Sequence, residues 1–310
     1  MFDPKCLSAL MAVAEEGGFE RAARRLNLTQ SAVSQRIRQL EEQAGQPVLA
    51  RTQPPRPTPV GQALLRHARR LALLEEELNQ ELARELGDGA DQGQDGDQRP
   101  WRTLALAVNA DTLATWLPGA VLPLLAEGGL ARRLALDLRV DDQERTHDML
   151  RRGEVAGCVS TRPNPMQGCR VQPLGVMRYH CCASPDFAAR FFPDGLSHAG
   201  AALAPAVVFN RDDAVHDTFL ASRLGVSPEG APRHHVPDSW RFVDFVLAGA
   251  GYGLVPRLQA GEHLRAGRLV DLAPEAPLPV PLFWHCWNVP SRLLDDLGAA
   301  LGRAAQRELA

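Results

Sequence analysis

The sequence predicts an α/β protein in two parts, a small helical head and a larger body in which strands and helices alternate. The chain has 310 residues, enough for two or three domains of about 100–200 residues each. Residues 1–70 hold 11 Lys and Arg against 6 Asp and Glu, a balance of +5, whereas the whole chain is at −3. A stretch with almost no apolar residues, 87–100, separates the two parts. The basic head is expected to meet a polyanion.

Three helices are predicted at the start of the head. Apolar residues recur at helical spacing over 3–16, and two glycines end that helix. A second helix is predicted over 19–26. After a tight connection at Asn27-Leu28, Thr29 is suited to cap a third helix over 30–43. Two short helices joined by a tight turn indicate a helix-turn-helix.

The third helix is predicted to bury one face and expose the others. Val33, Ile37 and Leu40 fall at i, i+4 and i+7 and form one apolar stripe. The remaining faces carry Gln, Ser and Arg, which can donate hydrogen bonds to base edges and phosphates in a DNA major groove. This helix is therefore the candidate for reading DNA.

A wing and a long helix complete the head. Residues 47–58 predict a short strand, a proline-stiffened tip and a return strand. From 58 to about 86 no helix breaker follows Gly61, so a helix of about 28 residues, roughly 42 Å long, is expected. We expect it to pair with a second copy of itself; packing along its own domain is the alternative. The expected dimer seam consists of Leu64, Leu71, Leu74 and Leu78.

The body is predicted to be α/β with largely parallel strands. Residues 87–100 are rich in Gly, Asp and Gln and should form a flexible linker. Beyond them, strand-like and helical runs alternate. The strand-like runs are 104–108, 134–140, 155–160 and 207–210, and the helical runs are 113–125, 142–152, 213–224 and 240–247.

Several protein classes are not indicated. No run approaches the roughly 18 apolar residues of a membrane span, and residues 1–15 lack the apolar run of a signal peptide, so we expect a cytoplasmic protein that joins the nucleoid when bound to DNA. The six cysteines form no C-x-x-C pair. Residues 249–254 lack the last glycine of a dinucleotide fingerprint, and His234-His235 are expected in an exposed loop rather than on a metal. We expect no enzyme, no cofactor and no metal.

Two adjoining stretches resemble the DNA-binding half of LysR-type transcriptional regulators: FERAARRLNLTQSAVSQRIRQLEEQAGQPVLAR and PRPTPVGQALL. Three further stretches resemble the lysine- and arginine-responsive ArgP and LysG branch of that family: RTQPPRPT, LAVNADTLATWLPGAV and VDDQERTHDMLRRGEVAGCVS. The resemblance covers nearly the whole chain. It implies a regulator of amino-acid export or metabolism genes that binds double-stranded operator DNA and a small-molecule effector, assembles as a homodimer or homotetramer, and has RNA polymerase as a candidate partner.

The resemblance and the helix chemistry together give the expected DNA contacts. Gln30, Ser34 and Gln35 are assigned mainly to bases, and the other residues to phosphates or to either. Similarity to the family places the wing beside the minor groove, where negative potential attracts arginine. The full set is Thr29, Gln30, Ser31, Ser34, Gln35, Arg36, Arg38, Arg51 and Arg56.

The resemblance also implies a body like that of periplasmic binding proteins, with two lobes joined by crossing strands and an effector between them. The expected divisions are a winged helix-turn-helix at 1–58, a dimerisation helix at 59–86, a linker at 87–100, lobe one at 101–179 plus 282–310, and lobe two at 180–281.

Polar residues that follow strands are expected to line the cleft. A cationic effector needs a carboxylate, for which Asp111 is favoured and Asp141, Asp142, Asp212 and Asp213 are alternatives. Capping the next helix is the alternative role for Asp111 or Thr112. The expected effector site is Asn109, Asp111, Thr112, Asp141, Ser160, Thr161, Asn210, Asp212, Asp213 and Ser239.

Overall fold

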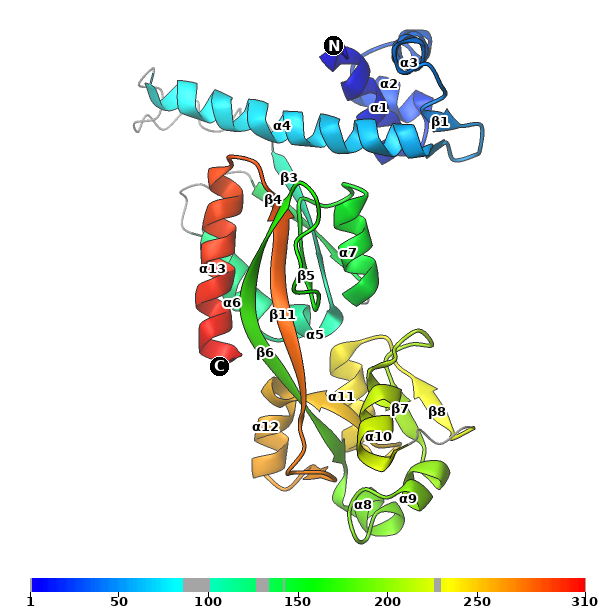
Figure 1. Ribbon diagram of the computed structural model, residues 1–310, viewed down its shortest axis with the longest axis vertical. Coiled ribbons are helices and arrows are strands. Elements are labelled where there is room, and N and C mark those ends of the chain that lie inside the picture. The colour runs from blue at the N-terminus through cyan, green and yellow to red at the C-terminus, as the bar shows by residue number, and fades with distance from the viewer. Residues whose placement is uncertain (1, 86–100, 127–133, 142, 226–229, 310) are drawn as a thin grey trace.

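The computed structural model describes residues 2–85, 101–126, 134–141, 143–225 and 230–309. Figure 1 shows the head at one end of a long helix and the body on the other side of that helix. The predicted linker at 87–100 and the candidate Asp142 lie outside the described residues. The predicted α/β fold class is confirmed, with one correction to the strand directions given below.

The head is built from three helices, as predicted. They are α1 (Pro4–Glu16), α2 (Phe19–Arg25) and α3 (Gln30–Ala44). Val33, Ile37 and Leu40 of α3 are at most 4% exposed and pack in the head core. Thr29 caps α3, since its Oγ1 accepts a hydrogen bond from the Ala32 N–H at 3.2 Å. The apolar stripe and the cap thus fix which face of α3 is free for other contacts.

A two-stranded hairpin forms the predicted wing. Strand β1 (Leu49–Ala50) pairs antiparallel with β2 (Arg56–Pro57). The next helix passes close to this hairpin at Gly61, where a Cβ atom would lie 1.9 Å from the Val48 carbonyl oxygen. Only glycine allows this approach, so Gly61 sets how the wing sits against the helix that follows.

Helix α4 (Pro59–Glu85) spans the head and extends beyond it. Leu64 is 7% exposed and belongs to the head core of its own chain, so its assignment to a seam with a second copy is wrong. The reason is that the first turns of α4 cover α1. Leu71 packs partly on the same core, whereas Leu78 is 53% exposed. The first half of the helix therefore belongs to the head.

The middle of α4 also contacts the body. Arg69 donates from Nη1 to the Gly153 carbonyl at 2.7 Å, and Arg70 lies over the Trp287 ring at 5.7 Å. Glu77 Oε1 accepts hydrogen bonds from Ser291 Oγ at 2.7 Å and from the Leu293 N–H at 3.3 Å. One helix thus orients the head relative to the body.

Seven strands of the body form one sheet, in the order β10-β6-β11-β5-β3-β4, with β9 also paired to β6. Only β3 with β4 and β3 with β5 are parallel, so the prediction of largely parallel strands is wrong for this sheet. The strands are β3 (Arg102–Val108), β4 (Leu134–Val140), β5 (Gly157–Ser160), β6 (Cys169–Ala183), β9 (Gly253–Pro256), β10 (Val270–Asp271) and β11 (Leu278–Trp287).

The antiparallel pairing of the two long strands β6 and β11 explains why the prediction of largely parallel strands is wrong. Their antiparallel register runs from Leu278 opposite Tyr179 to Trp287 opposite Cys169. Figure 1 shows this two-stranded ribbon passing from one lobe of the body into the other. One strand of the ribbon leads the chain into the second lobe and the other leads it back, so the two must run antiparallel. The alternation of helices and strands in the sequence does not reveal this pairing.

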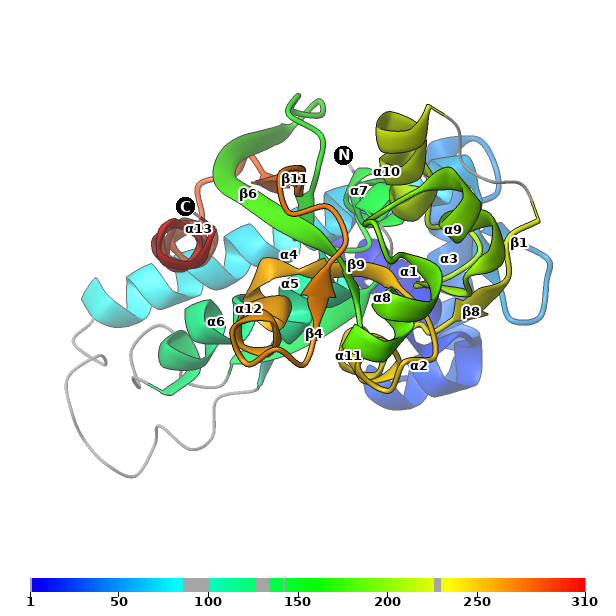
Figure 2. The ribbon, with the colours of Figure 1, turned by 90° about the horizontal axis from the view of Figure 1, so that it is seen from below.

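The first lobe surrounds the upper half of the ribbon. Its helices are α5 (Ala110–Ala114), α6 (Leu117–Ala126), α7 (Gln143–Arg151) and α13 (Arg292–Glu308). The single helix predicted over 113–125 is divided into α5 and α6, because Pro118 lacks the N–H that would continue the first helix. Helix α13 packs on α6 and β6, and Figure 2 shows it end-on beside the ribbon.

The second lobe surrounds the other half of the ribbon. A short parallel pair, β7 (Ala206–Val208) and β8 (Arg233–His235), packs beside β9. His234 and His235 are exposed as expected, but they form a strand rather than a loop. The helices are α8 (Pro185–Phe191), α9 (His198–Leu203), α10 (Val215–Leu224), α11 (Ser239–Leu247) and α12 (Arg257–Arg265).

In the part of the chain that the structure describes, no helix has both the length and the apolar character that a membrane crossing requires.

Glu77→Ala should loosen the contact between α4 and the body. The variant loses the acceptor for a first-turn N–H of α13, and such acceptors stabilise proteins by about 0.5–2 kcal/mol. Urea unfolding followed by circular dichroism measures the loss. Glu75→Ala removes an exposed carboxylate from the same helix and serves as the control. Equal losses in the two variants would show that the Glu77 contact does not stabilise the protein.

Candidate functional site

The predicted DNA-contacting residues of α3 lie on its outer faces. Thr29, Gln30, Ser31, Gln35 and Arg38 are exposed. Ser34 and Arg36 are half-buried. The Thr29 hydroxyl is occupied as the helix cap. Figure 1 places α3 on the side of the head away from the body, where a ligand as large as DNA has access.

The wing adds two exposed arginines, Arg51 and Arg56. Two basic residues of α2 are paired within the head. Arg25 pairs with Glu15 at 2.7 Å and Glu16 at 3.3 Å, and Arg24 pairs with Glu20. The exposed positive charge next to the outer face of α3 thus includes Arg38 of α3 and Arg51 and Arg56 of the wing.

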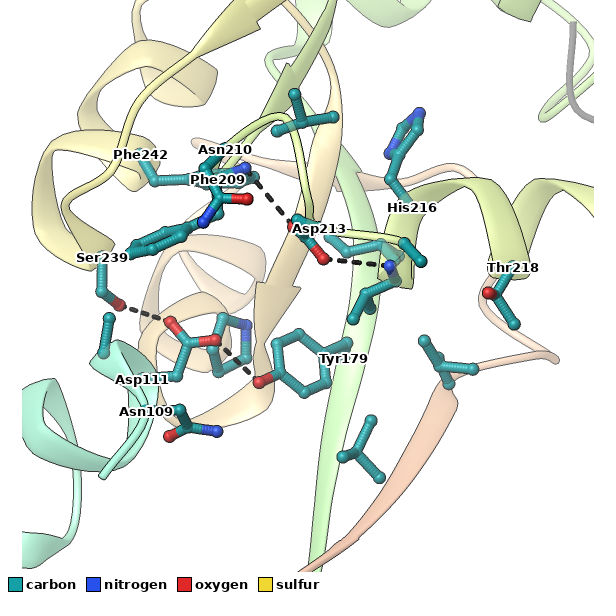
Figure 3. A pocket seen from close by; sticks show the side chains of 18 of the residues that line it. Asn109, Asp111, Tyr179, Phe209, Asn210, Asp213, His216, Thr218, Ser239 and Phe242 are labelled. Atoms are coloured by element: carbon teal, nitrogen blue, oxygen red, sulfur yellow. Dashed lines mark hydrogen bonds between the residues drawn. The ribbon is translucent and has the colours of Figure 1, made fainter. Parts of the chain in front are cut away.

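A cavity of about 780 Å³ lies between the two lobes of the body. This volume is in the range of small-molecule binding sites. Its walls come from the starts of α5, α10 and α11, from α7, and from the β6–β11 ribbon (Figure 3). The chain thus brings segments from both lobes to one cavity.

Eight of the ten residues predicted for the effector site line this cavity. Thr112 and Ser160 do not, since both are fully buried behind the wall. Ser160 Oγ accepts a hydrogen bond from the Arg162 N–H at 3.2 Å. Their assignment to the effector site is therefore withdrawn. The lining residues among those predicted are Asn109, Asp111, Asp141, Thr161, Asn210, Asp212, Asp213 and Ser239.

Asp111 connects both lobes. Its Oδ2 accepts a hydrogen bond from the Tyr179 hydroxyl and its Oδ1 accepts one from Ser239 Oγ, each at 2.7 Å (Figure 3). Asn109, not Asp111, caps α5, because Asn109 Oδ1 accepts from the Thr112 N–H at 2.8 Å. The capping alternative for the Asp111 side chain is therefore wrong.

The environment of Asp111 disfavours its charged form. Burial raises the pKa of the Asp111 carboxyl, and the nearby Asp213 raises it further. The hydrogen bonds from Ser239 and Tyr179 act in the opposite direction, because they stabilise the carboxylate. A cation placed beside Asp111 would lower this pKa.

The other acidic residues of the cavity are held in place. Arg145 of α7 donates from Nη2 to Asp212 at 3.2 Å across the cleft and lies 3.7 Å from Asp141. Asp213 Oδ1 accepts from the Val215 N–H at 2.9 Å, and Asn210 Oδ1 accepts from the Asp212 N–H at 2.8 Å. The loop that leads into α10 is thus fixed by its own side chains.

The titratable groups lining the cavity are mostly acidic. Four aspartates face one arginine, Arg145. His216 is 3% exposed, and burial lowers its pKa to about 4, so its ring is neutral at neutral pH. Val207, Phe209 and Phe242 supply an apolar wall. The arrangement favours a ligand with cationic ends and an apolar middle.

The lining residues that sequence analysis missed include Arg145, Tyr179, His216 and Phe242. Arg145 follows Asp141 by four residues in the sequence, a spacing that favours ion pairs on a helix, and this signal could have been used. No sequence signal marks Tyr179 or Phe242, because strand pairing and lobe packing bring them to the cavity.

Comparisons with known proteins identify both parts of the chain. Residues 5–62 match the family described as "Bacterial regulatory helix-turn-helix protein, lysR family", and residues 97–306 match the "LysR substrate binding domain". The HTH-type transcriptional regulator ArgP of Pseudomonas fluorescens (strain Pf-5) is 46% identical over 310 residues, which cover 100% of this chain and 98% of that protein. ArgP of Pseudomonas aeruginosa (strain PAO1) is 48% identical over 298 residues, 96% of this chain and 94% of that protein.

Two solved structures are similar over nearly their whole length. The crystal structure of ArgP from Mycobacterium tuberculosis has a TM-score of 0.85 and 38% identity, covering 98% of this chain and 97% of that one. Full-length LysG from Corynebacterium glutamicum with bound effector Arg has a TM-score of 0.77 and 33% identity, covering 99% of each chain.

His216 should make the protein sensitive to acid. Its pKa of about 4 lies below the roughly 6.5 of an unfolded histidine, so the unfolded state binds more protons between these values. The contribution of His216 to stability is complete above about pH 6.5 and is lost as the pH falls toward 4, by on the order of 3 kcal/mol.

Urea unfolding at several pH values tests this. His216→Phe should unfold with a shallower acid dependence than the native protein, whereas His198→Phe, at an exposed position of α9, should retain the native dependence. An unchanged acid slope in His216→Phe would assign the sensitivity to other groups.

Proposed function

The chain belongs to the LysR family of DNA-binding transcriptional regulators, and we propose that it senses a basic amino acid, lysine or arginine, in the cavity between its lobes. The observation that carries this proposal is the set of four carboxyl groups facing one guanidinium group in a cavity of about 780 Å³. A ligand with two cationic groups would offset part of this negative charge. The related LysG was solved with Arg as its effector, which supports the same class of ligand.

The two ends of a basic amino acid find different partners in this cavity. Its ammonium and side-chain cation fit the aspartates, with Asp111 as the most deeply placed. Its carboxylate fits Arg145 and the side chains of Thr161 and Asn210. The methylene stem fits the apolar wall at Phe242. We propose binding without chemical conversion of the ligand.

We further propose how the head reads DNA in the cytoplasm. Gln30, Ser34 and Gln35 contact base edges in the major groove, and Arg51 and Arg56 of the wing contact the backbone beside the minor groove. The remaining contacts, mainly to phosphates, come from Thr29, Ser31, Arg36 and Arg38.

For assembly, we propose that the exposed end of α4 pairs with a second copy of the chain. Leu78 and Leu82 are 53% and 48% exposed, and Leu71 and Leu74 are half-buried in the single chain. Contacts between bodies would then join two dimers into a tetramer. RNA polymerase remains a candidate partner. An effector changes DNA binding only if it binds one arrangement of this assembly more tightly than another.

Base-reading and phosphate-binding residues of the head should respond differently to substitution. Gln35→Ala should weaken binding to the cognate operator by about 1–3 kcal/mol with little change on random DNA. Arg51→Ala should weaken binding to both DNAs and reduce the slope of log affinity against log salt by about 1. Fluorescence anisotropy at several salt concentrations measures both effects.

Arg307→Ala is the matched control, because it removes an exposed arginine from α13 of the body. It should leave affinity and salt slope unchanged. Equal losses of Gln35→Ala on operator and random DNA would contradict base reading by Gln35.

Cationic ligands should be preferred over neutral molecules of the same shape. Calorimetric titration of the full chain should show saturable binding of L-arginine and L-lysine. L-citrulline and L-norleucine should bind about tenfold to a hundredfold more weakly, because a hydrogen bond to a charged group contributes about 1.5–3 kcal/mol. Citrulline that binds as tightly as arginine would contradict the proposed class of effector.

A further inference from the structure

The Ser239 hydroxyl has two oxygen neighbours but only one hydrogen. Its Oγ lies 2.7 Å from Asp111 Oδ1 and 3.2 Å from Gln259 Oε1. Gln259 Nε2 donates to the Ser239 carbonyl at 3.5 Å, which turns Oε1 toward the hydroxyl. Reversing the amide would remove this hydrogen bond and leave two carbonyl oxygens 3.5 Å apart. With an ionised Asp111, one of the two contacts of Ser239 would contain no hydrogen.

One additional proton on Asp111 satisfies every contact. A protonated Oδ1 would donate to Ser239 Oγ, which would free the Ser239 hydroxyl to donate to Gln259 Oε1, while the Tyr179 hydroxyl donates to Oδ2. Ser239, Gln259 and Tyr179 are each 5% exposed. An unsatisfied contact in such a buried place is costly, so the hydrogen-bond count favours the neutral acid.

The surrounding charges favour the same form. Among the described residues, no arginine, lysine or histidine forms an ion pair with Asp111. Asp213 adds negative charge beside it, and Arg145 is engaged with Asp141 and Asp212. The other titratable group of the α10 wall, His216, is neutral because burial lowers its pKa to about 4. Burial and Asp213 raise the pKa of Asp111 itself.

We propose that Asp111 is a neutral carboxylic acid in the free protein and that binding of the cationic effector ionises it, releasing one proton to the solvent. The inference rests on the proposed function, since it requires a cationic effector. The charge of the site is conserved in this step, because one cation enters as one proton leaves.

Ionisation also changes the hydrogen bonds between α11 and α12. Once Asp111 has lost its proton, the Ser239 hydroxyl donates to Asp111 Oδ1, and Gln259 Oε1 loses its donor. The effector thereby alters a contact between α11 and α12 inside the second lobe.

Calorimetric titration of the full chain with L-arginine at neutral pH tests the proton release. Titrations in phosphate and in Tris differ in the enthalpy of buffer ionisation, so the difference in heat gives the number of protons exchanged. We expect release of about one proton per arginine, and an affinity that rises about tenfold per pH unit below the pKa of Asp111.

Asp111→Asn identifies the source of the proton. The asparagine Nδ2 can donate to Ser239 and its Oδ1 can accept from Tyr179, as the neutral acid does, so the fold should be retained. This variant should bind arginine more weakly, with no proton release and no pH dependence. Asp141→Asn, in the same cavity, should also weaken binding but should still release the proton.

Each outcome has a definite meaning. Arginine binding without proton release, or release that persists in Asp111→Asn, overturns the inference and leaves the proposed function intact. Absence of binding by both arginine and lysine overturns the proposed function itself. If Asp111→Asn does not fold, infrared difference spectra of the native protein decide: a carboxylic-acid C=O band must disappear when arginine binds, and its absence in the free protein overturns the inference.

Discussion

The antiparallel pairing of β6 with β11 is the constraint on which the body depends. The two strands run side by side from Tyr179 opposite Leu278 to Cys169 opposite Trp287, and both lobes pack on this one ribbon. The cavity exists because the ribbon is the shared wall of both lobes. A register shift between Leu282 and Phe283 lies near the middle of the ribbon. Motion of one lobe relative to the other must therefore bend or twist these two strands.

Helix α4 links this body to the DNA-binding head. Its first turns complete the head core through Leu64, and its middle contacts the first lobe through Arg69, Arg70 and Glu77. Glu77 also binds the start of α13, which packs on β6. A continuous path of contacts thus joins the ribbon to the head through α13 and α4.

The acidic residues of the cavity differ in their partners. The aspartates are divided between two roles. Asp141 and Asp212 are bound to Arg145, which spans the cleft, whereas Asp111 is bound only by hydroxyl groups among the described residues. Burial and the nearby Asp213 raise the pKa of the Asp111 carboxyl, so a cation beside it would stabilise its charged form.

The sequence by itself determined the head, the family and most elements of the body, because helix caps, apolar periodicity and motifs act within a few neighbouring residues. Thr29, Val33 and Ile37 behave as their spacing predicts. It also indicated eight of the cavity residues, since polar residues that follow strands meet at one edge. Only the tertiary structure decided that Leu64 is buried in its own head and that Asp111 meets Tyr179 and Ser239, which lie 68 and 128 positions away. Strand register and lobe packing create these contacts, and no local pattern encodes them.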